Sequence, residues 1–360
     1  AASDVYKRQT GIRQDTYYSG PSWNRYFNPD LTWEVGEKIN LGLDLQLFND
    51  FNLTFDIFRE KRRDIFMTRE NSIPEIVGTG ETKITSNNGE MENKGLDLAI
   101  DYNKQITKDF FLSFKSTLTF ARNKVLKMDE PPYFEYPGLS DVGHPLGTYW
   151  GYVADGLFPD QETIDNSPRQ DLGYTPQPGD IKYVNQPNAK GEYDNVINSN
   201  DRVAIGHPYD PELVYGFGPS MKWKNWDFSF FFQGVARTSF MMYGMHPFGT
   251  TSIKNMLQFV ADDHWSVDNP NPNAAYPRLT KDSNGNNDQY STYWLRNAAF
   301  LKLKNAEIGY TYKGMRFYLS GVNLLTFSPF KHWDPEMGGG NGLYYPTQRV
   351  FNIGFQMTIQ

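Results

Sequence analysis

Cysteine is absent from the 360 residues, so the chain has no disulfide, no thiolate metal site and no cysteine nucleophile. No stretch of about 18 consecutive apolar residues is present, which argues against a transmembrane helix. An excess of positive charge is also missing, because the net charge is −7. Proteins that bind nucleic acid normally carry a basic footprint, so no nucleic-acid partner is expected.

The signatures of enzymes and metal sites are missing as well. The five histidines lie in separate segments without the spacing of metal ligands, and no nucleophile elbow or phosphate-binding glycine loop occurs. The acids of "ADDHW" (261–265) and "HWDPE" (332–336) are typical of turns, and "DSNGNND" (282–288) lacks the glycine and glutamate of a calcium loop, which favours an exposed polar loop tip. We therefore expect no enzyme activity, no catalytic residue, no metal and no cofactor.

Aromatic residues, in contrast, are abundant. Phe 26, Tyr 23 and Trp 8 make up 16% of the chain, while all hydrophobic residues together reach 39%. A chain rich in large amphipathic rings and modest in aliphatic residues favours a surface with an aromatic belt, or one that stacks carbohydrates, over a compact α/β enzyme.

Strict alternation of apolar and polar residues predicts the strands. In "INLGLDLQLFNDFNLTFDIF" (39–58), leucines and phenylalanines alternate with Asn, Asp, Gln and Thr on both sides of a tight turn. The same pattern continues along the chain, and turn residues bound each stretch. We expect about nine long strands, near 38–48, 52–67, 91–103, 110–126, 211–224, 226–236, 298–312, 315–325 and 348–360.

Short and long connections alternate between these strands. The long segments are expected at 68–90, 127–210, 237–297 and 326–347, with one short helix near 251–262. Short turns at one membrane face and long loops at the other are typical of a transmembrane β-barrel. The sequence thus predicts an all-β fold, with an antiparallel barrel sheet over 31–360 after a ragged segment 1–30, whose first nine or so residues read as a foreign end.

Several blocks, in order, resemble SusC/RagA-type TonB-dependent outer-membrane transporters. They are "NKGLDLAIDYN" (93–103), "PLGTYWGYVADGLF" (145–158), "PGDIKYVN" (178–185), "DRVAIGHPYDPELVYGFGPSMKWKNWDFSFFFQG" (201–234), "YWLRNAAFLKLKNAEIGYTY" (293–312), "RFYLSGVNLLTFSPFKHWDPE" (316–336) and "YPTQRVFNIGFQMTI" (345–359). The resemblance covers nearly all of the chain after about residue 20. It departs from the family at Asn185 and Ala189, where many relatives carry acids, and at Gln360, where relatives usually end on an aromatic residue.

This resemblance implies the C-terminal portion of a large plugged barrel of the 22-strand class, in the bacterial outer membrane. It also implies TonB-linked import of oligosaccharides or peptides. The partners would be a SusD-like surface lipoprotein, the TonB complex acting through N-terminal parts that this sequence does not contain, and outer-membrane lipid. The alternative is a secreted, soluble β-rich carbohydrate-binding protein or glycosidase, which would bury the apolar strand faces rather than turn them to lipid.

Loop aromatics are the candidates for contact with cargo or with the lid protein, because sugar rings stack on aromatic faces and Trp and Tyr dominate protein interfaces. They are Tyr149, Trp150, Tyr152, Phe158, Trp265, Trp294 and Trp333. Packing of the loops against one another is the competing interpretation. The basic run "REKRRD" (59–64) is expected to end a strand on a solvated rim, near anionic lipid head groups.

Overall fold

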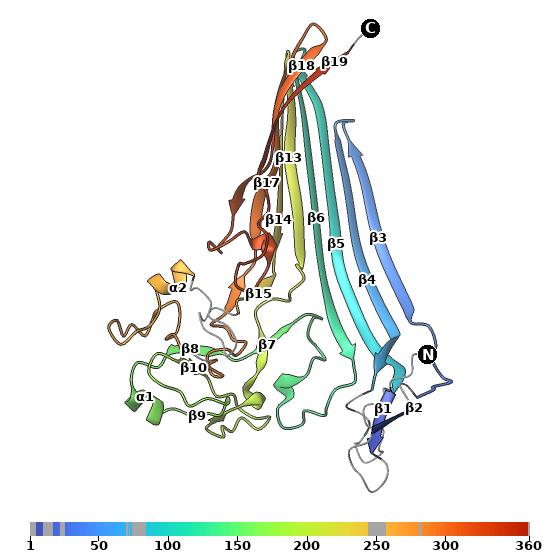
Figure 1. The fold of residues 1–360 in the computed structure, drawn as a ribbon. Helices are drawn as coiled ribbons and strands as arrows, with labels where there is room; N and C mark the ends of the chain where they lie inside the picture. The colour runs from blue at the N-terminus through green and yellow to red at the C-terminus, as the bar shows by residue number, and fades with distance from the viewer. Residues whose placement is uncertain are drawn as a thin grey trace.

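The computed structural model describes residues 5–9, 17–21, 26–69, 71, 73, 84–243, 257–280 and 283–358, the first two ranges by backbone alone. One antiparallel sheet of nine strands dominates it (Figure 1). The sheet order is β19-β18-β17-β14-β13-β6-β5-β4-β3. The strands are β3 (Val35–Leu47), β4 (Phe51–Thr68), β5 (Thr85–Thr107), β6 (Phe110–Lys127), β13 (Leu213–Trp223), β14 (Trp226–Ala236), β17 (Phe300–Tyr312), β18 (Met315–Phe327) and β19 (Val350–Met357).

Every one of the nine expected strands is present, and the short connections join them as tight hairpins. Lys313 and Gly314 link β17 to β18 with φ of 51° and 79°, as a two-residue turn of the hairpin type requires. β5 extends six residues further toward the loops than the alternation predicted, and it also runs past the expected end. In the N-terminal segment, expected to be ragged, β1 (Val5–Gln9) pairs antiparallel with β2 (Tyr17–Pro21).

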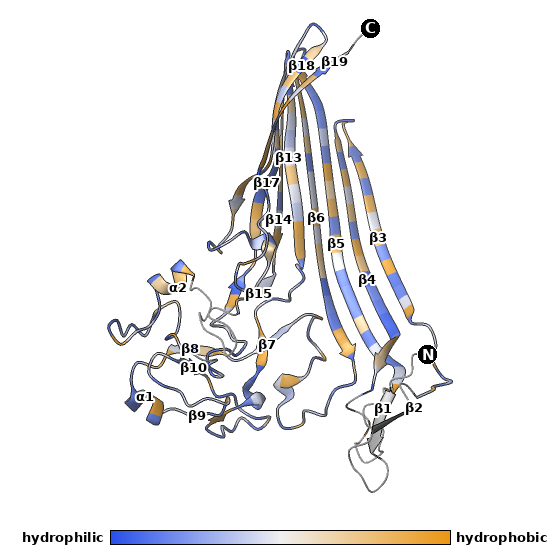
Figure 2. Ribbon diagram, in the orientation of Figure 1, coloured by the Kyte–Doolittle hydropathy of each residue, from blue (hydrophilic) through white to orange (hydrophobic). Residues whose placement is uncertain are grey.

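The sheet has one apolar and one polar face. Leu43 pairs in register with Phe55, Phe55 with Leu98, and Leu98 with Leu118, so that apolar side chains form continuous rows across the strands. On the other face Asp44 accepts a hydrogen bond from Thr54, and hydropathy alternates along β3 to β6 (Figure 2). Polar side chains thus share one surface and apolar side chains the opposite one.

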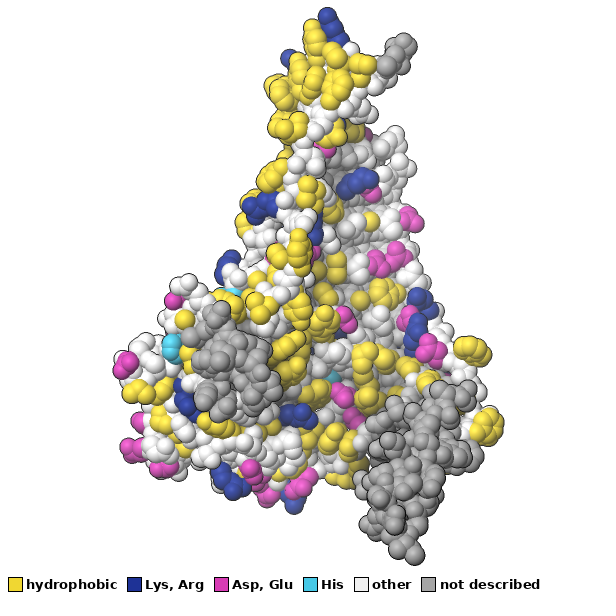
Figure 3. Space-filling view, in the orientation of Figure 1, with side chains coloured by type: hydrophobic (Ala, Val, Ile, Leu, Met, Phe, Trp, Pro, Cys, Tyr) yellow, Lys and Arg dark blue, Asp and Glu magenta, His cyan; other side chains and the backbone are white. Residues whose placement is uncertain are grey.

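No other layer of the described residues covers the apolar face. Leu41 is 74% exposed at one edge of the sheet and Ile353 is 87% exposed at the other. Hydrophobic side chains crowd the surface over the narrow end, where β18 and β19 lie (Figure 3). A soluble sandwich would bury such a face. None of the helices in the described ranges has the length and apolar character needed to cross a membrane.

The long segments gather at the end of the sheet opposite the hairpin turns (Figure 1). We call the residues 128–212, 237–243, 257–280, 283–299 and 328–349 the loop layer. It contains short paired strands. Of the helix predicted near 251–262, residues 258–262 form a helix, and residues 251–256 lie outside the described ranges. Its elements are η2 (Pro137–Leu139), β7 (Tyr149–Gly151), β8 (Ala154–Leu157), α1 (Gln161–Asp165), β9 (Arg169–Gln170), β10 (Ile181–Tyr183), β11 (Val196–Ile197), η3 (Ser199–Asp201), β12 (Val203–Ile205), β15 (Ser239–Met241), α2 (Gln258–Asp262), β16 (Leu295–Asn297) and η4 (Pro335–Met337).

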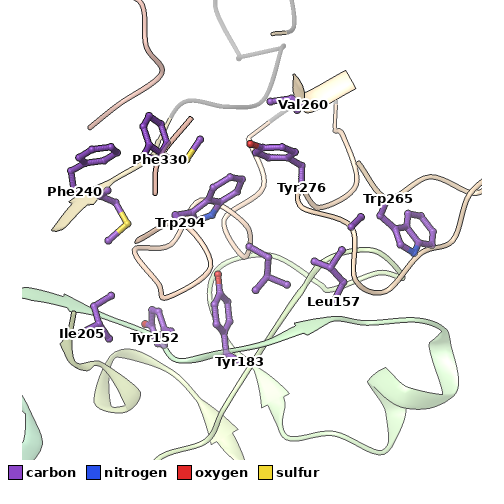
Figure 4. Packing of buried hydrophobic residues seen from close by; sticks show 14 of the residues in the cluster. Tyr152, Leu157, Tyr183, Ile205, Phe240, Val260, Trp265, Tyr276, Trp294 and Phe330 are labelled. Atoms are coloured by element: carbon purple, nitrogen blue, oxygen red, sulfur yellow. The ribbon is translucent and has the colours of Figure 1, made fainter. Parts of the chain in front are cut away.

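The principal hydrophobic core of the described residues lies in the loop layer rather than in the sheet. Its members come from segments far apart in the sequence, and Tyr152 packs on Tyr183 with ring centroids 5.2 Å apart (Figure 4). Phe240 meets Phe330 edge to face at 4.9 Å. The loops are therefore an ordered, packed unit, which gives their surface residues fixed positions.

Candidate functional site in the loop layer

A buried carboxylate organises the centre of the loop layer. Asp180, which follows the glycine of "PGDIKY", is fully buried. Its Oδ1 accepts hydrogen bonds from Arg278 Nε at 2.7 Å and from the side-chain amides of Asn284 and Asn287 at 2.9 Å each. A buried charge requires such partners, so Asp180 ties three loop segments into one structure.

The asparagines of "DSNGNND" are buried, which corrects the expected exposed loop tip. Asn286 is fully buried, and its Nδ2 donates to the carbonyl of Ile181 at 2.8 Å. Asn287 Oδ1 accepts from the backbone N–H of Ile181 at 2.9 Å. Asp282 lies outside the described residues. Within those residues no group of three or more acidic, histidine or cysteine side chains is arranged to hold a metal ion.

The structure also places the acids of "HWDPE" (332–336) and "ADDHW" (261–265). Asp334 and Glu336 both bind the Nζ of Lys302, at 2.6 and 2.5 Å. Burial raises the pKa of each carboxyl, but Lys302 together with Thr347 beside Asp334 and Lys304 beside Glu336 outweighs it, and the net pKa lies below the ordinary value. The pair is therefore held ionised by a buried lysine. In "ADDHW", Asp262 ends α2 and Asp263 follows it.

Of the seven aromatic candidates, four are buried, and three of these, Tyr152, Trp265 and Trp294, belong to the loop core. Tyr152, Phe158, Trp265 and Trp294 are 3%, 1%, 7% and 8% exposed. Trp294 Nε1 donates to the carbonyl of Asn287 at 2.6 Å. These four rings are enclosed by the loops in this structure, and their contact with cargo or lid stays a prediction.

The other three candidates, Tyr149, Trp150 and Trp333, are half-buried. Trp150 donates its Nε1 to Asp141 at 2.7 Å and Trp333 donates its own to the carbonyl of Gly338 at 2.9 Å. Their ring edges are thus fixed within the loops while part of each side chain reaches solvent. Contact with cargo or lid stays a prediction, carried best by these three.

Tyr149 belongs to a wider set of tyrosines. Burial raises its pKa to about 12, and the neighbouring phenols of Tyr209 and Tyr290 add to the effect. Tyr243 and Tyr344 place their hydroxyls 3.5 Å apart, and the contact raises the pKa of Tyr243, with a smaller contribution from Tyr290. We call Tyr149, Tyr209, Tyr243, Tyr290 and Tyr344 the tyrosine cluster; all except Tyr149 are about half or more exposed.

Sequence reasoning missed Tyr209, Tyr243 and Tyr344 as site residues. They come from three different segments of the loop layer, and only the packing of the loops brings them near one another. Each is an exposed tyrosine beside Pro, Gly or another Tyr, a weak signal that many loop residues share. The cluster offers amphipathic rings with hydroxyl edges, a chemistry that suits sugars, peptides and protein surfaces alike.

The basic run 59–64 lies within β4 rather than at the end of a strand, which corrects the expectation. β4 continues to Thr68. The side chains alternate between the two faces, so that Arg59 binds Glu92 on one side and Arg62 binds Glu34 at 2.8 Å on the other. The run is therefore shared between two surfaces and forms no single basic strip.

Comparison with known proteins gives a consistent result. The family model described as TonB dependent receptor-like, beta-barrel matches residues 3–324. TonB-dependent receptor P26 of Formosa agariphila is 28% identical over 97% of this chain and 36% of its own length. TonB-dependent receptor SusC of Bacteroides thetaiotaomicron is 27% identical over 95% of this chain and 34% of its own length.

The solved structures agree in fold. The RagAB peptide importer in its open-open state matches with a TM-score of 0.73 at 20% identity, and the match covers 99% of this chain and 38% of that chain. The RagAB peptide transporter matches with a TM-score of 0.69 at 22% identity, over 99% of this chain and 38% of that chain. The chain thus spans about a third of the length of the curated relatives it matches.

Proposed function

Since the chain belongs to the family of TonB-dependent receptor-like β-barrels, we propose that it supplies wall strands and loops to a transporter that imports oligosaccharides or peptides. Energy would come through the TonB complex. The family and its relatives confirm the predicted antiparallel barrel fold and the outer-membrane location, so the alternative of a secreted soluble protein is set aside.

The observation that carries the proposal is the separation of the chain into two parts. The sheet presents an uncovered apolar face and a polar face, as a barrel wall between lipid and an aqueous interior does. The loop layer is packed at one end of that wall and displays the tyrosine cluster on it. Wall and fixed mouth loops are what this third of a transporter would contribute.

The cargo and the lid belong to the proposal. A relative described as a peptide importer favours peptide as one cargo class, and the SusC resemblance favours a SusD-like lipoprotein as the partner over the loops. The tyrosine cluster suits both, because it combines exposed ring surface with hydroxyl groups at fixed positions.

Growth of the native host provides the test. Deletion of the gene should abolish growth on one class of oligosaccharide or peptide as the sole nutrient, and deletion of TonB should have the same effect. A strain without the gene that grows normally on every glycan and peptide tested would contradict the proposal.

A matched pair of variants tests the cluster. Tyr209→Ser combined with Tyr290→Ser and Tyr344→Ser should reduce uptake by about tenfold or more, since loss of a stacking contact costs on the order of 1 kcal/mol for each ring. Tyr193→Ser is the control, because Tyr193 is 61% exposed in the loop layer but outside the cluster. If both variants took up the nutrient equally well at equal protein levels, the tyrosine cluster would not take part in uptake.

A further inference from the structure

Three cations lie side by side on the apolar face of the sheet, at its loop end. Arg59 pairs in register with Lys94, and Lys94 with Arg122. Their side chains are 57%, 59% and 55% exposed. Like charges at directly opposed positions destabilise a sheet. Such a row is unfavourable unless enough anions lie beside it to offset the repulsion.

The row lies at the boundary of the apolar belt. On this face, β13 runs from Leu213 to Trp223 with outward apolar side chains, over 11 residues, in register with Phe120 to Phe110 of β6. A tilted strand crosses the hydrocarbon layer with about 9–11 residues. Arg122 is the next outward residue after Phe120, about 7 Å further along the strand. The cations therefore lie at the level of the lipid head groups.

Two largely buried carboxylates, those of Glu92 and Glu212, contact the cations of the row. Glu92, whose side chain is 10% exposed, accepts from Arg59 Nε at 2.6 Å and binds Lys94 Nζ at 2.7 Å. Glu212, 4% exposed, binds Arg122 at 3.1 Å and Arg237 at 2.6 Å, and the Arg237 guanidinium lies 5.9 Å from the ring centroid of Phe120. We call Arg59, Lys94, Arg122 and Arg237 the cation row. Four cations on two carboxylates leave two positive charges facing outward.

We infer that the cation row binds the phosphate-bearing head group of an outer-leaflet lipid. Each guanidinium has five N–H donors, so one carboxylate contact leaves a fork that fits phosphate oxygens. The row is continuous with the lipid-facing belt, and lipid is the neighbour that this belt has in the membrane. The inference depends on the membrane location alone and is independent of the cargo.

The test uses the intact outer-membrane protein that carries this chain, in lipid nanodiscs of phosphatidylcholine with added lipid A. Native mass spectrometry measures how much lipid A remains bound. The combination Arg59→Gln, Lys94→Gln and Arg122→Gln should weaken the retention of lipid A at least about tenfold. Each cation near an anionic surface raises the affinity roughly fivefold. Lipid A without its phosphates should bind equally weakly to both proteins.

The matched control removes three cations from the opposite, polar face: Lys38→Gln, Arg62→Gln and Lys115→Gln, at side chains 65%, 52% and 70% exposed. This variant should retain lipid A like the wild type. The pair Arg59→Lys and Arg122→Lys keeps both charges but removes both guanidinium forks, so it should lower the retention of lipid A by less than the triple variant does, and it carries the test if the triple variant fails to assemble. The inference would be overturned if the row variants retained as much lipid A as the wild type, or if the control variant lost as much lipid A as the row variants. Binding of inorganic phosphate as tight as that of lipid A would overturn it as well.

Discussion

Arg278 donates its Nε to Oδ1 of Asp180 at 2.7 Å, across 98 positions of sequence and with the acceptor fully buried. This pair joins the segment before β10 to the segment after α2. Burial would lower the pKa of Arg278, but the bonds to Asp180 and to the hydroxyl of Tyr174 together outweigh it and the pKa is raised. Neither charge can be removed alone without leaving its buried partner uncompensated.

Arg278→Met should therefore destabilise the loop layer by about 3–5 kcal/mol. The variant leaves a buried carboxylate that only amides and backbone groups contact. Hydrogen exchange of the loop amides measures the effect. The double variant Arg278→Met with Asp180→Asn removes both charges and should recover part of the loss. A double variant as unstable as the sum of the two single variants would show that the pair is not coupled.

Gly179 has φ of 88°, and a Cβ there would meet the ring of Trp265 at 2.2 Å. Gly179→Ala should cost about 2–4 kcal/mol, since backbone strain and overpacking each contribute about 1–3 kcal/mol. Gly173→Ala is the control, because Gly173 has φ of 75° but open space around it. The difference between the two, measured as sensitivity of the loops to protease, isolates the clash with the indole.

The orientation of the sheet predicts opposite effects at two adjacent positions. Leu43→Asp places a carboxylate on the lipid side and should lower the yield of assembled protein, with a cost of about 2 kcal/mol or less. Asp44→Leu loses the hydrogen bond from Thr54 on the polar face and should be tolerated. The fraction of protein that resists heat denaturation in detergent measures assembly. If Asp44→Leu assembled less well than Leu43→Asp, the leucines would face the interior of the barrel instead of lipid.

Tyr149 should ionise only near pH 12, whereas a tyrosine in the unfolded chain ionises near pH 10. Between these two values the unfolded chain loses its proton first. The contribution of Tyr149 to stability is thus complete below pH 10 and is lost as the pH rises toward 12. The difference in phenolate absorbance between the wild type and Tyr149→Phe measures the titration directly. A titration at pH 10 would show that Tyr149 is solvated.

The sheet was predictable from sequence because a barrel wall repeats one rule. Side chains along each strand must alternate between lipid and water. The face of Leu41, Leu43 and Leu45 can therefore be predicted from the strand itself, without knowledge of any other segment. The loop layer follows no such rule. Phe158 and Trp265 are buried, while Tyr209 lies on the surface, and nothing local distinguishes them. The partners that bury an aromatic ring there, such as Trp265 on Gly179, come from distant positions.

The same limit explains the asparagines of 284–287. Polar residues beside glycine are typical of exposed turns, and their burial depends on a carboxylate more than 100 positions away in sequence. The blocks that resemble the family do not include residues 284–287, so the resemblance gave no indication of that contact. Buried polar networks of this kind have no local periodicity from which to predict them.

Because the core lies in the loop layer, the sheet and the loop layer are stabilised by different interactions. The sheet depends on backbone pairing and on the lipid or detergent around it, whereas the loop layer depends on buried aromatic packing in water. Denaturant that leaves the wall intact should first melt the loops, so tryptophan fluorescence from Trp294 and the heat-resistant fold of the sheet should report different midpoints. The mouth of the barrel is, in this respect, a small globular protein carried on a membrane scaffold.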